Sequence, residues 1–218
     1  MCAIALCAVD GHYGRQAAEF CAQNLLKFLT ANNSGCQGIP SAAEIQSRTV
    51  ALDAAFRESL SGAQCKAGST AVFAFIAAPT LQTAASASSA GFTIRVGSVG
   101  DSRALLLPRD GGVRQVSVDH KPDVESECKR ITAAGGHERN GRVDGDLNVS
   151  RAIGDFWYKR DNKRAPTEQK IIALPDVFDV AAQPGDVLLL ASAGAFQNSS
   201  NETIAEVNLD RAFIARLM

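Results

Sequence analysis

The sequence predicts an α+β protein with antiparallel strands, and three observations lead to this class. Apolar residues recur at helical spacing in the first sixty residues. The part that follows contains short apolar segments separated by turn residues. The composition, 46% hydrophobic and 21% charged in 218 residues, is that of one globular domain rather than of a disordered chain or a coiled coil.

Two helices are expected before residue 61. Residues 15–31 carry apolar side chains at helical spacing, and the run Asn32-Asn33-Ser34-Gly35 ends that pattern. A second helix begins at Ser41, because Ser41 and Glu44 form a capping box in which each side chain bonds the other residue's amide. Its apolar face is formed by Ile45, Leu52, Phe56 and Leu60.

The strands are expected to be short and antiparallel. Residues 3–9 predict a strand buried on both faces that closes at Asp10-Gly11. Further strands are predicted at 71–77, 92–99, 103–107, 113–118, 177–181 and 186–192. Residues 79–91 are read as a long hairpin loop, 123–134 as a helix and 141–170 as an extended, flap-like segment.

The end of the chain is expected to be helical. Ser199-Ser200-Asn201-Glu202 repeats the capping-box pattern, and Phe213, Ile214 and Leu217 give the final turn an apolar side. We find no internal repeat and no linker, so residues 1–218 are expected to form a single domain.

Charge and cysteine content exclude several function classes. The chain has 22 basic and 23 acidic residues, a net charge of −1, which gives no electrostatic basis for binding nucleic acid or an anionic membrane. No apolar run approaches the roughly 18 residues that span a bilayer. Residues 2–9 lack the basic flank of a signal peptide, and the six cysteines form no Cys-x-x-Cys pair. We therefore expect free thiols in an intracellular, reducing compartment.

Polar residues at strand ends suggest a metal site. Asp10, Gly11 and His12 follow the first apolar strand, and hard divalent cations prefer oxygen ligands such as a carboxylate or a glycine carbonyl. Asp101 lies between two predicted strands beside Arg103. Taken alone, each of these is more simply a turn with a local ion pair.

Other polar and aromatic residues receive structural assignments. His120 and His137 have no carboxylate or cysteine partners at ligand spacing, so both are expected to be structural. Trp157 and Tyr158 are expected to pack under the adjoining segment, with peptide binding as the alternative.

Seven blocks in order resemble the metal-dependent protein phosphatases of the PPM, or type 2C, family. They cover the chain from residue 6 to about residue 205, and the Asp-His-Lys-Pro and Ser-Arg-Ala-x-Gly-Asp blocks are specific to that family. The blocks are Asp10–His12, Gly68–Ala71, Val99–Ala104, Asp119–Pro122, Glu127–Gly136, Leu147–Asp155 and Asp186–Ser192. The resemblance implies a four-layer α/β/β/α fold with a central antiparallel β-sandwich. It also implies a binuclear Mg²⁺ or Mn²⁺ site and hydrolysis of phosphoserine and phosphothreonine.

The resemblance also implies roles for individual residues. Asp10 matches the aspartate that bridges the two metals, and Gly11 matches the glycine whose carbonyl faces the site. His12 matches the proposed general acid, and Asp101 matches an aspartate linked to an additional, weaker metal. In this chemistry the metals orient the phosphate and activate a bridging water. Ser150, Arg151 and Asp155 are expected to be structural parts of the flap.

The sequence departs from the family pattern at the metal ligands. Ala193 stands where the family has a ligating aspartate, and Gln197 stands where it has a second carboxylate. The family's first strand and its terminal Asp-Asn pair are also not found in these 218 residues. Two divalent cations about 4 Å apart repel by roughly 16 kcal/mol at an effective dielectric near 20, so a pair cannot be held without carboxylates that offset the repulsion. We expect weak or single-site occupancy by Mg²⁺ or Mn²⁺, or none.

These departures predict a pseudophosphatase that acts by binding a phosphoprotein or another protein, as a monomer. Two alternatives stay open. One is an active Mg²⁺- or Mn²⁺-dependent serine/threonine phosphatase, in which the missing ligands come from a longer chain or from Asp101, Asp146 or Asp155. The other is a fragment whose incomplete sandwich leaves exposed sheet edges.

Overall fold

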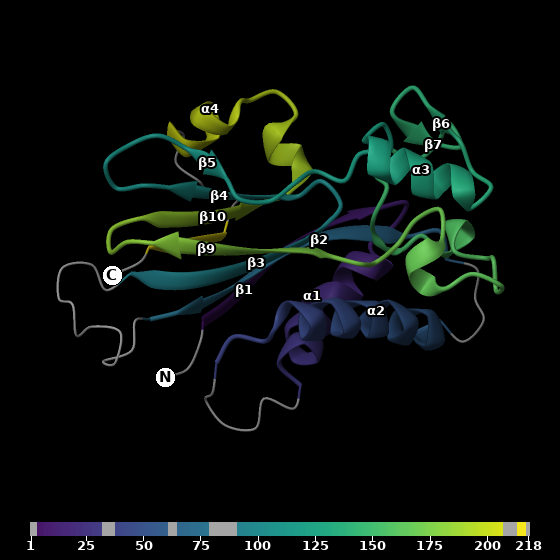
Figure 1. Cartoon of the computed structure of the whole chain (residues 1–218), viewed down its shortest axis with the longest axis horizontal. Helices are drawn as coiled ribbons and strands as arrows, with labels where there is room; N and C mark the ends of the chain where they lie inside the picture. Colours follow the sequence, from purple (N-terminus) through teal and green to yellow (C-terminus); the bar gives the residue numbers. More distant parts are fainter. Residues whose placement is uncertain (1–3, 32–37, 61–64, 79–90, 207–212, 217–218) are drawn as a thin grey trace.

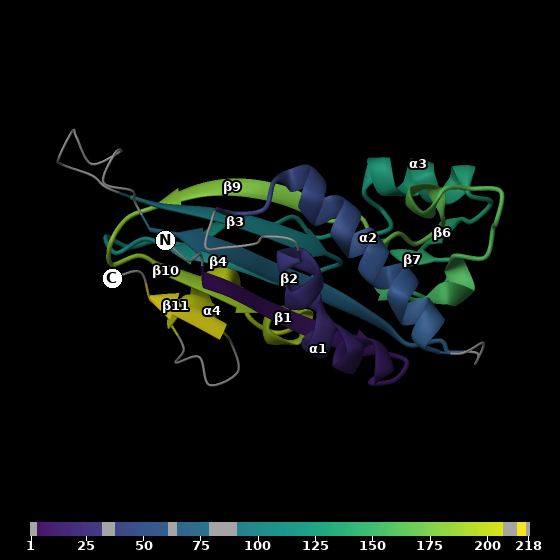
Figure 2. The same ribbon diagram turned by 90° about the horizontal axis from the view of Figure 1, so that it is seen from below.

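The computed structural model describes residues 4–31, 38–60, 65–78, 91–206 and 213–216. Two β-sheets lie face to face at the centre, as Figures 1 and 2 show, and helices α1 and α2 cover the outer face of one sheet. A short helix and a 3-10 turn lie over the other sheet. This arrangement confirms the α+β class and the layered sandwich that the sequence predicts.

The helices and strands have the following bounds. The helices are α1 (Gln16–Thr30), α2 (Ala42–Ser59), α3 (Glu125–Ala133) and α4 (Asn201–Glu206), with 3-10 turns η1 (Phe156–Tyr158), η2 (Pro166–Glu168) and η3 (Ala193–Phe196). The strands are β1 (Ile4–His12), β2 (Gly68–Ala77), β3 (Phe92–Val99), β4 (Arg103–Leu107), β5 (Arg114–Gln115), β6 (Glu138–Arg139), β7 (Arg142–Val143), β8 (Ile153–Gly154), β9 (Asp176–Ala182), β10 (Val187–Ala191) and β11 (Phe213–Arg216).

The first sheet has the strand order β1-β2-β3-β9, and all of these neighbours are antiparallel. Strand β2 is buried on both faces: Phe73 and Phe75 pack toward the helices, whereas Val72 and Ile76 pack between the sheets. The first strand was predicted to be buried on both faces, but β1 is less buried than that. Strand β1 contacts both apolar layers, but it lies at the edge of the sheet and its residues are mostly half-buried.

The second sheet has the order β11-β10-β4-β5, and Figure 1 shows α4 on its outer side. The expected final helix was wrong, because Phe213–Arg216 form a strand that pairs with β10, with Phe213 opposite Leu190. A short apolar run is compatible with a helix or a strand, and here it forms a strand that pairs with the free edge of β10. The cap of α4 is also shifted by one residue: Ser200 accepts a hydrogen bond from the Thr203 amide.

Helices α1 and α2 agree with their sequence signals. In α2 the capping box is formed as predicted, since Ser41 Oγ accepts from the Glu44 amide and the Glu44 carboxylate accepts from the Ser41 amide. The buried faces of α1 and α2 contribute Leu25, Ile45 and Phe56 to the core against the first sheet. These two helices therefore form the outer layer that covers this sheet.

Residues 141–170, here called the flap segment, contain only short elements: β7, β8, η1 and η2. Helix α3 packs on this segment through Ile131, which joins Val143, Leu147 and Ile171 in a separate apolar cluster. Of the loop predicted at 79–91, residues 79–90 lie outside the described residues. Cys7, Cys21, Cys65 and Cys128 are free thiols, and only Cys21 is fully buried. Within the described ranges, no helix is long and apolar enough to cross a membrane.

Candidate metal centre

The register of three strands gathers the predicted site residues at one end of the first sheet. Strand β1 pairs with β2 so that Gly11 lies opposite Ser69 and His12 lies opposite Gly68. Strand β8 pairs with the other edge of β2 at the same position, where Gly68 lies opposite Gly154. Asp155 follows Gly154 directly, so this register brings it beside His12.

His12 and Asp155 form a close polar contact across Gly68. His12 Nε2 lies 2.6 Å from Asp155 Oδ2, and the His12 side chain is 25% exposed whereas that of Asp155 is 1% exposed. The Asp155 backbone is left-handed, with φ +51°, a conformation that is uncommon for residues other than glycine. A Cβ at Gly68 would collide with both His12 Nε2 and the Asp155 carboxylate. The contact therefore requires glycine at position 68.

This contact was not among the sequence expectations. Asp155 was expected to be a structural residue of the flap, and the structure places it in direct contact with His12, the predicted general acid. The two residues are 143 positions apart, so local spacing gave no sign of the contact. The available signal was the Gly154-Asp155 pair at the end of the Ser-Arg-Ala-x-Gly-Asp block.

Asp10 lies near the end of β1, and Asp101 lies in the turn that joins β3 of the first sheet to β4 of the second. Burial and then the Asp101 charge raise the pKa of Asp10, whereas His12 lowers it. Lys121 Nζ lies 2.5 Å from Asp101 Oδ2 and supplies a positive charge to that carboxylate. Beneath them, the hydroxyls of Thr70 and Ser102 lie 2.7 Å apart and connect β2 to the turn that carries Asp101. Hard divalent cations prefer carboxylate oxygens, so Asp10 and Asp101 are the candidate ligands in this region.

Ala193 lies at the same end of the molecule as Asp101. Strand β10 pairs with β4 so that Ala191 lies opposite Arg103, and the chain continues from Ala191 toward the end where Asp101 lies. Ala193 begins η3 with a methyl group that cannot ligate a metal. No group of three or more His, Cys, Asp or Glu side chains suited to a metal ion occurs among the described residues.

The other two carboxylates that sequence reasoning considered as substitutes already have partners. Asp146 accepts hydrogen bonds from the hydroxyls of Tyr13 and Tyr158, each at 2.8 Å, and these bonds lower its pKa. Asp155 contacts His12. The structure therefore brings Asp10, Gly11, His12 and Asp101 to one region, adds Asp155 to it, and places Asp146 in a tyrosine contact. The ligand roles of Asp10, Gly11 and Asp101 and the acid role of His12 stay predictions.

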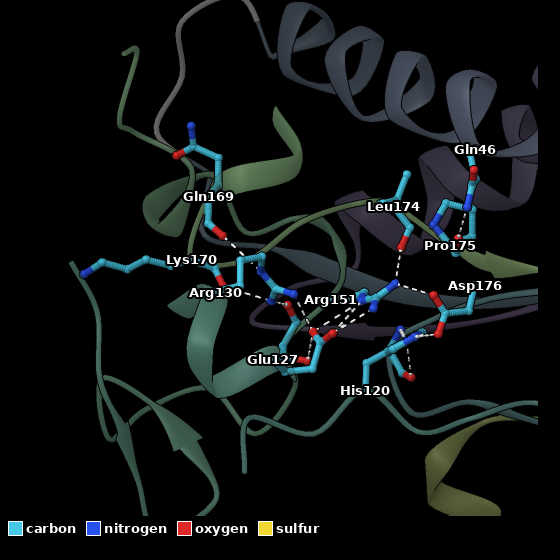
Figure 3. A network of polar contacts seen from close by, with 12 residues as sticks. Gln46, His120, Glu127, Arg130, Arg151, Gln169, Lys170, Leu174, Pro175 and Asp176 are labelled. Atoms are coloured by element: carbon cyan, nitrogen blue, oxygen red, sulfur yellow. Dashed lines mark hydrogen bonds and ion pairs between the residues drawn. The ribbon is translucent and has the colours of Figure 1, made fainter. Parts of the chain in front are cut away.

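A buried ion network supports the turn that carries Asp101, and Figure 3 shows its members. His120 is buried, and its Nδ1 lies 3.1 Å from both the amide nitrogen and the carbonyl oxygen of Gly100. Its Nε2 lies 3.2 Å from Asp176 Oδ2, and Asp176 in turn pairs with Arg151 at 2.7 Å. Arg151 also pairs with Glu127 of α3. The structural role predicted for His120 agrees with these contacts.

Comparisons with known proteins agree with this architecture. The family described as Protein phosphatase 2C matches residues 3–211. Protein phosphatase 2C homolog 2 of Schizosaccharomyces pombe is 36% identical over 208 residues, which cover 95% of this chain and 52% of the relative. Protein phosphatase 2C 1 of Paramecium tetraurelia is 47% identical over 118 residues, 53% of this chain and 39% of the relative. The chain thus spans about half or less of these curated relatives.

A solved phosphatase structure has a similar fold. A phosphatase from Toxoplasma gondii superposes with a TM-score of 0.78 at 31% identity, and the alignment covers 88% of this chain and 69% of that one. The fold, the ordered sequence blocks and the matched residues 3–211 together show that this chain belongs to the protein phosphatase 2C family.

Proposed function

We propose that this phosphatase-family domain has lost the binuclear metal centre and acts by binding a phosphoprotein or another protein. The observation that carries the proposal is the alanine at position 193, together with Gln197 in place of the second carboxylate. Asp10 and Asp101 supply two negative charges, and the Lys121 ammonium already neutralises part of the charge on Asp101. Two divalent cations need more compensation than this arrangement supplies.

An active Mg²⁺- or Mn²⁺-dependent serine/threonine phosphatase is the second candidate. The observation that favours it is the 2.6 Å contact between His12 and Asp155, which orients an imidazole beside Asp10. In this alternative a longer chain supplies the missing ligands. When bound, a metal centre of this type polarises a phosphate and activates water. The residues of this chain would hold it through Asp10, Asp101 and the Gly11 carbonyl.

The experiment that separates the two candidates is Mn²⁺-dependent hydrolysis of a small aryl phosphate. The purified chain is compared with an Asp10→Ala variant at equal concentration. We expect no turnover above that of the variant, from a protein whose thermal unfolding is cooperative. Turnover that disappears in Asp10→Ala would overturn the binding proposal and support the enzyme.

Restoring the ligands tests the structural reason directly. The double variant Ala193→Asp with Gln197→Asp is titrated with MnCl₂ by isothermal calorimetry beside the parent chain. We expect the double variant to bind Mn²⁺ about tenfold tighter, because two added carboxylates offset the charge of the cation. The matched control is Ala195→Asp, which adds a carboxylate in the same 3-10 turn at a position that matches no family ligand. Equal affinity in all three proteins would show that this loop does not face the cation.

A further inference from the structure

A second site lies away from the candidate metal centre, between helix α2 and the flap segment. A pocket of about 330 Å³ is lined by one face of the C-terminal half of α2 and by residues 159–169 of the flap segment. Figures 1 and 2 both show the flap segment beside the C-terminal end of α2. Three arginines line this pocket: Arg57 from α2, and Arg160 and Arg164 from the flap segment.

Two of these arginines are held on aromatic faces of the same 3-10 turn, η1. The Arg160 guanidinium carbon lies 3.3 Å from the ring centroid of Trp157, and that of Arg57 lies 4.5 Å from the ring centroid of Phe156. Arg57 also donates from Nη2 to the Lys159 carbonyl. A stacked guanidinium loses less rotational freedom when it binds a ligand, because its plane is already fixed. The two arginines are therefore pre-organised.

The contacts inside the pocket leave positive charge available. The Lys159 ammonium is buried and donates hydrogen bonds to both Asp53 carboxylate oxygens and to the Ala152 carbonyl. This pair is internally neutral, and it also anchors the flap segment to α2. Asp161 pairs with Arg164 through its Nε, which leaves both Nη groups of Arg164 without a partner among the described residues.

The remaining charges favour an anion. In the described part of the chain, Arg57 and Arg160 make no ion pair. Of the carboxylates that line the pocket, Asp53 and Asp161 pair with cations, and only Glu58 has no cationic partner among the described residues. Guanidinium groups bind phosphate through paired N–H donors, and a phosphate monoester offers three acceptor oxygens and nearly two negative charges.

We propose that this pocket binds a phosphorylated serine or threonine side chain of a protein segment, through Arg57, Arg160 and Arg164, without a metal ion. Trp157 is 51% exposed and acts as the positioning residue for Arg160. The expectation that Trp157 packs under the flap was wrong, since the ring lies at the surface with Arg160 on one face. The proposal rests on the proposed binding function and gives that function a location.

The test uses the whole chain in EDTA, so that metal-bound phosphate does not contribute. A fluorescein-labelled heptapeptide of alanine and glycine with one central phosphoserine is titrated by fluorescence anisotropy. We expect saturable binding that Arg160→Gln and Arg164→Gln each weaken by about tenfold, because each removes charge-assisted donors. Glu58→Gln is expected to strengthen binding about threefold, since it removes a nearby like charge.

Matched variants separate this site from general attraction to a basic surface. Arg114→Gln removes an exposed arginine of β5 on the other sheet and is expected to leave the affinity unchanged. Trp157→Ala is expected to weaken binding, whereas Trp157→Phe keeps an aromatic face for Arg160 and is expected to retain most of it. Equal affinity in Arg160→Gln, Arg164→Gln and the parent chain would overturn the proposal. Equal binding of the unphosphorylated peptide would also overturn it.

The two proposals fail in different experiments. Metal-dependent turnover would overturn the loss of the metal centre but leave phosphopeptide binding in EDTA unaffected. Absence of phosphopeptide binding, with no metal-dependent turnover, would overturn the pocket assignment alone. A peptide with glutamate in place of phosphoserine is expected to bind more weakly, because a carboxylate offers fewer acceptors and less charge.

Discussion

Gly68 is the residue on which the geometry of the candidate metal centre depends most directly. It lies opposite His12 on one side and Gly154 on the other, and an added Cβ would collide with the His12 and Asp155 side chains. We predict that Gly68→Ala lowers the free energy of unfolding by about 2 kcal/mol. This cost exceeds the roughly 0.4–1 kcal/mol that alanine gains by restricting the unfolded chain. Urea unfolding followed by circular dichroism measures the difference.

The matched control for this prediction is Gly194→Ala. The nearest heavy atom to an added Cβ there is Ser192 Oγ at 3.8 Å, an ordinary van der Waals distance. Its unfolding midpoint is expected to stay close to that of the parent chain. If Gly68→Ala unfolds at the same urea concentration as Gly194→Ala, the His12 and Asp155 side chains do not pack over Gly68.

At the residue scale, the sequence predicted the part of the site that is local in the chain. Asp10, Gly11 and His12 end a recognisable strand, and Asp101 occupies a recognisable turn. The contact between Asp155 and His12 was missed because it forms through strand pairing, and pairing between distant segments leaves no local pattern. The contact of Asp146 with Tyr13 was missed because the two residues lie 133 positions apart in the sequence.

At the scale of elements, the start of α2 has a testable energetic role. Ser41 and Glu44 bond each other's amides there, and the same helix carries Asp53 and Arg57 to the pocket. We predict that Ser41→Ala lowers the free energy of unfolding by about 1 kcal/mol, because it removes the acceptor for the Glu44 amide. Urea unfolding at neutral pH gives the value.

Ser47→Ala is the matched control for the capping prediction. Ser47 lies inside α2 and donates to the Glu44 carbonyl, so its replacement removes no cap. Alanine is the better helix former, and this gain opposes the loss of the Ser47 hydrogen bond. We therefore expect the free energy of unfolding to change by only a few tenths of a kcal/mol, in either direction. A Ser41→Ala effect as small as the Ser47→Ala effect would mean that the capping box contributes little to stability.

Element prediction succeeded where the pattern was long. Helices α1 and α2 and strands β2, β3 and β4 agree closely with their sequence signals, because they combine regular periodicity with clear stop residues. The prediction was wrong for β11, a four-residue apolar run whose type is decided by the open edge of β10. In the flap segment the elements are two or three residues long, which is too short for a periodic pattern to appear in the sequence.

At the scale of the whole molecule, the ion network in Figure 3 joins parts that are distant in the sequence. Glu127 of α3 pairs with Arg130 and with Arg151, and Arg151 pairs with Asp176 at the start of β9. Breaking a buried pair leaves an uncompensated charge, so this network couples α3 and the flap segment to the first sheet. Its loss is therefore expected to affect global rather than local stability.

The acid stability of the protein is predicted to depend on Glu127. Burial alone raises its pKa, but the hydrogen bond from Arg151 and the charges of Arg130 and Arg151 together lower the pKa to about 2, below its usual value of 4.5. A folded-state pKa below the unfolded one stabilises the fold above pH 4.5, and this contribution is lost as the pH falls from 4.5 toward 2. We expect a loss of about 3 kcal/mol from this group across that window, measured by urea unfolding at successive pH values.

Two variants of α3 isolate the contribution of Glu127 from that of other carboxylates. Glu127→Gln removes the titrating group, leaves Arg130 without its anion and leaves Arg151 with Asp176 as its remaining anion, so the protein is expected to be less stable at pH 7 and to lose less stability on acidification. Glu125→Gln removes a carboxylate whose side chain is 83% exposed on the same helix, and its pH profile is expected to follow that of the parent chain. If Glu127→Gln and the parent chain lose the same free energy between pH 4.5 and 2, the network does not control acid unfolding. The acid response would then be distributed over the surface carboxylates, and α3 would contribute to stability through its apolar contacts with the flap segment alone.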